Sequence, residues 1–374
     1  MTDTAPMLGA YVSIPKEDLQ GIFDALRGMG YTLVGPTLGE GAIIYDEIEG
    51  VDDLPIGWGD EQEAGTYRLR RRDDGAYFGY VVGPHSWKKY LYPPVMTLFS
   101  VERRNGTFKV AAPSEETPRY AFIGVRACEL QAIAVQDRVF LGGPYQEPHY
   151  KACRQGAFIL AVNCTEPGGT CFCASMRTGP RVGPGFDLAL TELEEVFLVE
   201  VGSEVGRQVL AGLDWRPAGA FELQAARQAM AEAEQRMGRR METSDLPNLL
   251  YQNLEHPRWD EVAQRCLSCT NCTQVCPTCF CSDVVEVSDL TGQKTGRVRV
   301  WDSCFSLEFS HVHGGNIRPA TRSRYRQWLT HKLASWIDQF GVSGCVGCGR
   351  CITWCPVGID ITEEVNAIRT EGAK

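Results

Sequence analysis

Residues 266–277 read CLSCTNCTQVCP, and residues 345–356 read CVGCGRCITWCP. Each stretch holds four cysteines, separated by gaps of two, two and three residues, and ends in proline. This spacing is typical of bacterial two-cluster ferredoxins, in which the fourth cysteine of each run ligates the other cluster. This cysteine spacing occurs twice, each time followed by proline, so it is not a coincidence. The sequence therefore predicts two neighbouring 4Fe–4S clusters and a role in electron transfer.

The crossed rule of these ferredoxins assigns the ligands of both clusters. A 4Fe–4S cube needs four soft anionic donors, which thiolates supply. One cluster is expected on Cys266, Cys269, Cys272 and Cys355, and the other on Cys345, Cys348, Cys351 and Cys276. Zinc is the alternative for paired Cys-x2-Cys elements. It is disfavoured, because a zinc site needs only four ligands and its pairs typically lie about 15–20 residues apart.

A third group of cysteines follows two similar apolar runs. FIGVRAC at 122–128 ends in Cys128, and FILAVNC at 158–164 ends in Cys164. Such runs predict buried strands at Tyr120–Val125 and Ala157–Val162, and ligand sites in open α/β sheets lie beyond the carboxyl ends of strands. In an extended Cys171-Phe172-Cys173, both sulfurs project from the same side. We therefore predict a third 4Fe–4S cluster on Cys128, Cys164, Cys171 and Cys173. Buried small apolar positions are the alternative for these four cysteines.

Four cysteines lie outside these groups, namely Cys153, Cys279, Cys281 and Cys304. The sequence Thr-Cys-Phe-Cys at 278–281 repeats that at 170–173. Core positions are favoured over substitute ligands for these four, because free cysteine is often a small buried side chain. His311 and His313 form a pair without nearby carboxylates, which favours a non-metallic role.

The composition argues against several classes of function. The chain has 374 residues, 44% of them hydrophobic and 22% charged, which predicts a globular protein of two or three domains. A net charge of -10 without a basic block argues against a nucleic-acid partner. No signal peptide and no run of 18 or more apolar residues is recognisable, so neither export nor a membrane span is expected. Sixteen cysteines in such a chain favour metal over disulfides and predict a cytoplasmic location.

The expected fold is of the α+β or mixed α/β class, in two domains. Residues 1–245 are predicted to form a mixed α/β domain that carries the third cluster. Residues 246–374 are predicted to form a ferredoxin-like domain with two 4Fe–4S clusters and an insertion at about 282–344. Other expected elements are helices at 16–28, 221–241 and 325–340, strands at 31–34, 42–45, 66–70, 76–82 and 298–301, and a hairpin turn at 73–75. No G-x-G-x-x-G after a strand and no Walker A sequence is present, so nucleotide chemistry is expected on other subunits.

From about Gly124 to Ile368 the chain resembles the iron–sulfur beta subunits of soluble, NAD(P)-linked NiFe sulfhydrogenases. The corresponding iron–sulfur subunits of anaerobic sulfite reductases are similar in layout. The resemblance rests on NCTEPGGTCFCASM at 163–176, CLSCTNCTQVCPTCFC at 266–281, DSCFSLEFSHVHGGNIRP at 302–319 and GCVGCGRCITWCPVGIDIT at 344–362. Around Cys128, Ala127 and Glu129 stand where the family usually has proline and aspartate.

The resemblance implies an electron-transfer subunit of an oxidoreductase complex, with no catalytic residues of its own. The implied partners are a NiFe hydrogenase large subunit, a cluster-bearing small subunit, and a flavin subunit that binds NAD(P). The implied reaction is reversible H2 oxidation coupled to NAD(P) reduction, with elemental sulfur or polysulfide as a further acceptor. Two alternatives stay open: the iron–sulfur subunit of an anaerobic sulfite reductase, and an iron–sulfur redox sensor or assembly scaffold without catalytic partners.

Overall fold

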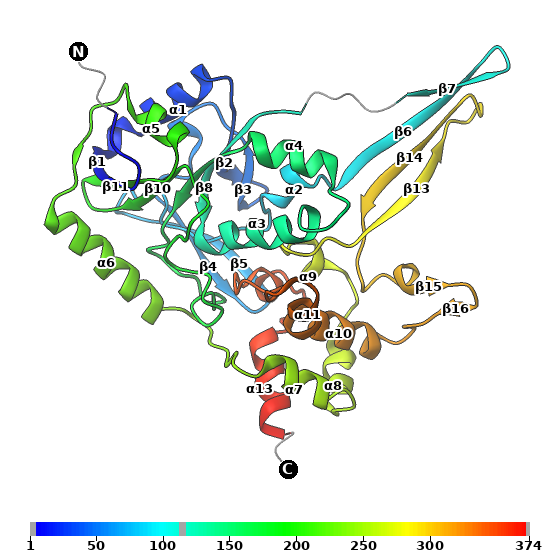
Figure 1. The fold of residues 1–374 in the computed structure, drawn as a ribbon. Helices are drawn as coiled ribbons and strands as arrows, with labels where there is room; N and C mark the ends of the chain where they lie inside the picture. Colours follow the sequence, from blue (N-terminus) through cyan, green and yellow to red (C-terminus); the bar gives the residue numbers. More distant parts are fainter. Residues whose placement is uncertain (1–4, 112–116, 372–374) are drawn as a thin grey trace.

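The computed structural model describes residues 5–111 and 117–371. Its N-terminal part is built on an eight-stranded mixed sheet in the order β12-β1-β11-β10-β9-β8-β2-β3. The central strands β10, β9, β8 and β2 run parallel, and the strands at both edges run antiparallel to their neighbours. Figure 1 shows helices on both sides of this sheet. The mixed α/β character expected for the N-terminal part is confirmed.

The elements of the N-terminal part are bounded as follows. The strands are β1 (Tyr11–Pro15), β2 (Thr32–Gly39), β3 (Ala42–Glu47), β4 (Trp58–Glu63), β5 (Thr66–Arg71), β6 (Val95–Arg104), β7 (Thr107–Ala111), β8 (Tyr120–Arg126), β9 (Phe158–Val162), β10 (Leu188–Glu192), β11 (Val196–Val201) and β12 (Arg216–Pro217). The α-helices are α1 (Leu19–Gly28), α2 (Lys88–Leu91), α3 (Ala127–Phe140), α4 (Pro148–Gly156), α5 (Glu204–Leu210) and α6 (Ala220–Gln235), and the 3-10 turns are η1 (Lys16–Asp18) and η2 (Val51–Asp53).

Both faces of the large sheet are buried, as expected for a sheet with parallel central strands. On one face, Phe23 of α1 and Leu210 of α5 pack into a core with Ile123 of β8. On the other face, Ile133 of α3 packs against Phe122 of β8. The apolar runs at 120–125 and 157–162 are thus central strands, and β8 and β9 are parallel neighbours. Cys128 and Cys164 therefore follow two adjacent strand ends, as predicted.

The predicted strand at 76–82 and its hairpin turn at 73–75 are wrong. The hairpin in this region is β4–β5, one element earlier. Residues 78–82 are buried, but the segment 76–82 forms no strand, because side chains from other segments make hydrogen bonds with its backbone groups. The Glu192 carboxylate accepts from the N–H groups of Tyr77 and Phe78, at 2.9 Å each, and the Arg126 guanidinium donates to the carbonyl oxygens of Phe78 and Tyr80, at 2.8 Å each. Because these backbone N–H and carbonyl groups already have hydrogen-bond partners, they do not need a neighbouring strand.

The helix predicted at 221–241 ends earlier, at Gln235. Beyond it the chain leaves the helix and binds the loop that carries Cys171 and Cys173. Arg239 N–H donates to the Cys171 carbonyl oxygen at 3.0 Å, and Met237 Sδ lies 3.8 Å from Cys173 Sγ. Met237 and Met241, which fit a helical stripe in the sequence, are buried by this loop contact instead.

The C-terminal part packs short helices around the cysteine runs, with Trp259, Tyr325 and Trp328 in their shared core. Its elements are α7 (Leu246–Gln252), α8 (Arg258–Arg265), α9 (Asn271–Gln274), β13 (Ser282–Ser288), β14 (Lys294–Trp301), η3 (Glu308–Ser310), β15 (His311–Val312), β16 (Gly315–Asn316), α10 (Thr321–Thr330), η4 (His331–Ser335), α11 (Trp336–Phe340), α12 (Arg350–Thr353) and α13 (Ile361–Glu371). The helix predicted at 325–340 is present, but it is interrupted by the π-helical turn η4.

The expected insertion at 282–344 is partly a β-arm. The strand predicted at 298–301 is the end of β14, which pairs with β13 and also with β6 of the N-terminal part. With β7 these strands form a four-stranded antiparallel sheet in the order β13-β14-β6-β7. Figure 1 shows this sheet projecting from the body of the molecule. The two parts of the chain therefore share one sheet as well as a packed boundary.

Candidate metal centre

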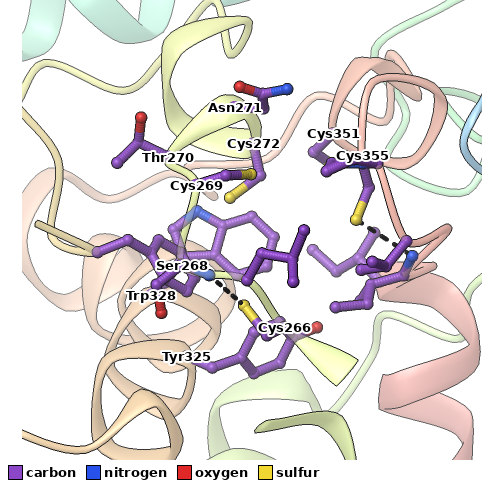
Figure 2. A pocket seen from close by; sticks show the side chains of 16 residues that line it. Cys266, Ser268, Cys269, Thr270, Asn271, Cys272, Tyr325, Trp328, Cys351 and Cys355 are labelled. Carbon is purple, nitrogen blue, oxygen red and sulfur yellow. Dashed lines mark hydrogen bonds between the residues drawn. The ribbon is translucent and has the colours of Figure 1, made fainter. Parts of the chain in front are cut away.

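The first predicted ligand set lies around one pocket. Cys266, Cys269, Cys272 and Cys355 all line it, together with Cys351. Figure 2 shows the three sulfurs of the 266–272 loop on one side and that of Cys355 on the other. Tyr325, Trp328 and Phe305 form apolar walls. The structure thus brings the crossed fourth cysteine of the second run to the first run, from a distant part of the sequence.

Backbone N–H groups point at the sulfurs of this set. Ser268 N–H donates to Cys266 Sγ at 3.4 Å, and Ile359 N–H donates to Cys355 Sγ at 3.3 Å (Figure 2). Ser268 and Thr270 both have positive φ, which winds the loop tightly enough for this approach. Hydrogen bonds of this kind stabilise anionic sulfur and are one determinant of cluster potential.

The second predicted set also converges. Burial raises the pKa of the Cys351 thiol, and neighbouring thiolates at Cys345, Cys348 and Cys276 raise it further. Gly347 N–H donates to Cys345 Sγ at 3.4 Å, the counterpart of the Ser268 contact in the first run. Cys351 of this second set also lines the pocket of the first set, together with Cys272. The two sets are therefore neighbours, as crossed ligation requires.

The third predicted set gathers where β8 and β9 end. Cys128 lies in the first turn of α3, Cys164 follows β9, and Cys171 and Cys173 lie on the loop after it. All four thiols are buried. Burial raises the pKa of Cys173 well above its usual range, with added contributions from Cys171, Cys164 and Cys348. Cys171 Sγ lies 3.9 Å from the carbonyl oxygen of Cys348, a member of the second set, so the third group borders the second set directly.

Glu129 fixes the start of α3, and with it the position of Cys128, although the proline and aspartate usual in the family are absent. Its carboxylate accepts from Arg126 N–H at 3.2 Å, three residues before it, and so caps the start of α3. It also accepts from the Tyr45 hydroxyl at 2.7 Å and pairs with Arg350 in the fully buried interior. Arg350 lies between Cys348 and Cys351. The longer side chain of glutamate therefore links the third group to the second run.

The donor chemistry fits iron–sulfur clusters. Burial raises the pKa of the Cys345 thiol to about 12, and a bound metal would stabilise its thiolate form. Among the described residues, no three His, Cys, Asp or Glu side chains are placed to hold a single metal ion. A cube distributes its ligands over four iron atoms, so its sulfurs need not converge on one point. The ligand roles themselves stay predictions.

The remaining candidates divide into two kinds. Cys153 is buried on α4 among apolar side chains, as expected for a core cysteine, and its Sγ lies 3.4 Å from His149 Nε2. His311 and His313 are exposed around the β15–β16 turn. Cys279 interacts with Cys276 of the second set, whereas Cys304 packs against the same core as Cys266 and Cys272 of the first set. The buried Lys88, Lys332 and Arg350 near the sulfurs were missed by sequence reasoning, and only the position of Arg350 between two ligands offered a signal.

Comparison with known proteins agrees with this geometry. Residues 265–359 match the model of a 4Fe–4S dicluster domain, which spans both cysteine runs and implies two 4Fe–4S clusters. No solved structure matches the chain. No helix in the described ranges combines the length and apolar character that crossing a membrane would take. A curated relative, Sulfhydrogenase 2 subunit beta of Pyrococcus furiosus, is 27% identical over 366 residues, which cover 96% of this chain and 98% of that protein.

The similarity thus extends well beyond the dicluster domain. The family model supports 4Fe–4S clusters and electron transfer in this chain. The relative is, by its name, a subunit of a sulfhydrogenase. The resemblance of this chain to the iron–sulfur beta subunits of sulfhydrogenases is confirmed over almost its whole length.

Proposed function

We propose that this chain is the electron-transfer subunit of a soluble, multi-subunit NiFe hydrogenase in the cytoplasm. It passes electrons between an arm that consists of the NiFe large and cluster-bearing small subunits and a flavin subunit that reacts with NAD(P). Sulfur or polysulfide is a further acceptor. The observation that carries the proposal is the series of three adjoining cysteine groups: Cys351 of the second set lines the pocket of the first set, and Cys171 Sγ of the third set lies 3.9 Å from the Cys348 carbonyl oxygen. A series of neighbouring one-electron centres is a conduit.

The proposed ligands are those of the crossed arrangement. Cys266, Cys269, Cys272 and Cys355 hold one 4Fe–4S cluster, Cys345, Cys348, Cys351 and Cys276 hold the second, and Cys128, Cys164, Cys171 and Cys173 hold the third. When bound, each cluster supplies a site that accepts and releases one electron. The chain's own contribution is to bury the sulfurs, to exclude water and to aim N–H donors at them, all of which tune potential.

Isolation of the tagged full-length chain from its source cells without oxygen tests the assignment. We expect the NiFe large and small subunits and the flavin subunit to co-elute, and H2-dependent NAD(P) reduction by the complex to be lost when the chain is absent. A sirohaem-containing partner would instead identify an anaerobic sulfite reductase. A chain that carries clusters but is always recovered alone would identify a redox sensor.

The third cluster has its own test. Replacement of Cys128 by alanine should lower the iron content of the anaerobically purified chain by about four atoms. Cys153→Ala is the matched control, since Cys153 is a buried cysteine outside every predicted ligand set. Equal iron in the two variants would show that the third group consists of ordinary core cysteines.

A further inference from the structure

Two polar atoms in the pocket of the first ligand set have no hydrogen-bond partner. Tyr325 and Trp328, both on α10, line this pocket together with the four cysteines of that set. The two side chains are only 2% and 4% exposed. Within the part of the chain that the structure describes, nothing forms a hydrogen bond with the Tyr325 hydroxyl or with Trp328 Nε1. Figure 2 shows both rings among the cysteine side chains of this set.

Such unpaired groups are rare, because burial removes the water that would otherwise bind them. Buried N–H and O–H groups in proteins nearly always have a hydrogen-bond partner, and an unpaired one destabilises the fold. Trp259, in the same core, follows this rule: its Nε1 donates to the Asn253 carbonyl oxygen at 2.8 Å. Trp87 Nε1 is also buried and unpaired, but Trp87 does not line this pocket. Tyr325 and Trp328 are distinguished by a pocket that all four proposed ligands of one cluster also line.

Contacts that involve no sulfur atom hold the two rings on the pocket wall. Tyr325 and Trp328 are three residues apart on α10 and therefore lie on the same side of the helix. Their ring centroids are 5.4 Å apart, and the Phe305 ring lies 6.1 Å from the first and 5.8 Å from the second. At the start of the helix, Thr321 Oγ1 lies 3.2 Å from Ser268 Oγ on the cysteine loop. The two polar atoms are thus kept beside the ligands.

A bound cluster would supply the missing acceptors. An indole N–H can only donate, and a tyrosine hydroxyl donates one hydrogen bond, so an acceptor in the pocket satisfies both. The sulfur atoms of a 4Fe–4S cluster and its thiolate ligands carry negative charge, and hydrogen bonds to charged acceptors are stronger than neutral ones. Backbone N–H groups already donate to Cys266 Sγ and Cys355 Sγ. The pocket thus offers two side-chain donors in addition to these backbone donors, as a buried anionic cluster requires.

We propose that the Tyr325 hydroxyl and the Trp328 indole N–H donate hydrogen bonds to sulfur atoms of the first 4Fe–4S cluster and raise its reduction potential. This role rests on the proposed function, in which the first ligand set holds that cluster. Reduction adds one electron and makes the sulfur atoms more negative, so the hydrogen bonds stabilise the reduced form more than the oxidised form. Of the sixteen cysteines, all of which the structure describes, only Cys269 is exposed. The two donors therefore adjust the potential of the cluster that has a ligand at the surface.

Redox titration of the anaerobically reconstituted full-length chain, followed by EPR, tests the proposal. Tyr325→Phe removes one hydroxyl and no ligand, so the iron content should be unchanged while the midpoint potential of one cluster falls. Tyr150→Phe is the matched control, because Tyr150 is also fully buried but its hydroxyl donates to Asp137 Oδ1 at 2.8 Å. The control should leave every potential unchanged. Full iron content with unaltered potentials in Tyr325→Phe overturns the proposal.

A second background assigns the shift to the first cluster. Cys266→Ala removes a ligand of that cluster only, so adding Tyr325→Phe to this variant should change no remaining potential. A shift that persists in the combined variant belongs to another cluster and overturns the donor role proposed for Tyr325. Unchanged iron in Cys266→Ala would instead overturn the first ligand set, and with it the proposed function rather than the donor role alone.

Trp328 is tested by detecting its proton directly. Pulsed EPR of the reduced protein in H2O and in D2O counts the exchangeable protons that couple to each cluster. Trp328→Phe should lose one such proton. Trp259→Phe, a substitution of the same size in the same core, should lose none, because its N–H group is bonded to a backbone carbonyl oxygen. Identical couplings in the two variants would overturn the role of Trp328. If the smaller ring itself lowers cluster occupancy, Tyr325→Phe decides the outcome, since it keeps the ring and should also lose one exchangeable coupling.

Discussion

At the scale of single residues, the buried pair of Arg350 and Glu129 connects the cluster domain to the N-terminal sheet. Neither side chain is exposed. Arg350 also donates to the carbonyl oxygens of Gly83 and His85, at 2.8 and 2.7 Å, so one guanidinium contacts three segments. Burial of such a pair is costly in itself, but loss of one partner leaves an unpaired charge inside the protein. Cys348 and Cys351 flank this arginine, so the pair also fixes the second run.

Glu129→Ala is therefore expected to destabilise the protein by about 3–5 kcal/mol, as for other buried pairs that lose one partner. The thermal midpoint, followed by loss of visible cluster absorbance without oxygen, measures the effect. Glu204→Ala is the control, because its pair with Arg207 is exposed and therefore contributes little to stability. Equal midpoints for the two variants would contradict a structural role for the Arg350–Glu129 pair.

Crossed ligation predicts a non-additive loss of iron. Cys266 and Cys355 are assigned to the same cluster, so the variant with both replaced by alanine should lose about four iron atoms, no more than either single variant. Cys345 and Cys355 are assigned to different clusters, so replacement of both should remove about eight. Iron analysis and EPR of the reduced proteins measure both. The reverse pattern would mean that each run of cysteines holds its own cluster.

At the scale of elements, the second cysteine run is pressed against the loop of the third group. Phe172 N–H donates to the Gly347 carbonyl oxygen at 2.9 Å. Gly347 and Gly349 have φ of 65° and 78°, and a Cβ on Gly349 would lie 2.5 Å from Thr170 Oγ1 and 2.6 Å from its carbonyl oxygen. A conformation accessible mainly to glycine thus allows the contact between two cysteine-bearing loops.

Gly349→Ala should separate these loops and lower the occupancy of the second and third clusters. The substitution combines left-handed strain of about 1–2 kcal/mol with a backbone collision that cannot relax locally. Gly292→Ala is the matched control: its φ is 64°, but nothing lies within 4 Å of the added Cβ. Iron content and the visible spectrum after anaerobic purification compare the two variants. Equal cluster loss in both would mean that backbone strain alone is responsible.

The elements also show which parts of the fold could be predicted from the sequence and which could not. Cysteine spacing is a local property with direct chemical meaning, so the three predicted ligand sets could be grouped before any fold was known, and the strand pair β8–β9 with them. Local sequence could not show that the predicted strand at 76–82 is absent. Its backbone groups form hydrogen bonds with the side chains of Asp60, Glu192 and Arg126, which come from distant segments. Pairing of β14 with β6 joins residues about 200 positions apart and has no local signal. The burial of Lys88 and Lys332 likewise depends on contacts with distant segments and has no local signal in the sequence.

At the scale of the whole molecule, the predicted division at residue 245 separates two sequence regions that do not behave as independent bodies. The β-arm takes two strands from each, Arg350 is bonded within the N-terminal part, and Gly65 N–H donates to the Ile352 carbonyl oxygen at 3.1 Å. Arg239 pairs with the buried Asp360 across the same boundary, at 2.6 Å. The cysteines of the second and third sets lie along this boundary. We therefore expect the proposed second and third clusters to depend on both parts.

The fragment 246–374 should accordingly fail to keep two intact clusters when produced alone, although it contains all eight ferredoxin-type cysteines. Without residues 1–245, β13 and β14 lose β6, Arg350 loses Glu129, and the loop at 345–351 loses its cover. Production of both fragments together should restore the clusters, because the missing contacts are non-covalent. Iron content and protease resistance of the single and paired fragments measure this dependence. A separate 246–374 fragment with about eight iron atoms and unaltered protease resistance would show that the cluster domain is autonomous and that the boundary contacts only dock it.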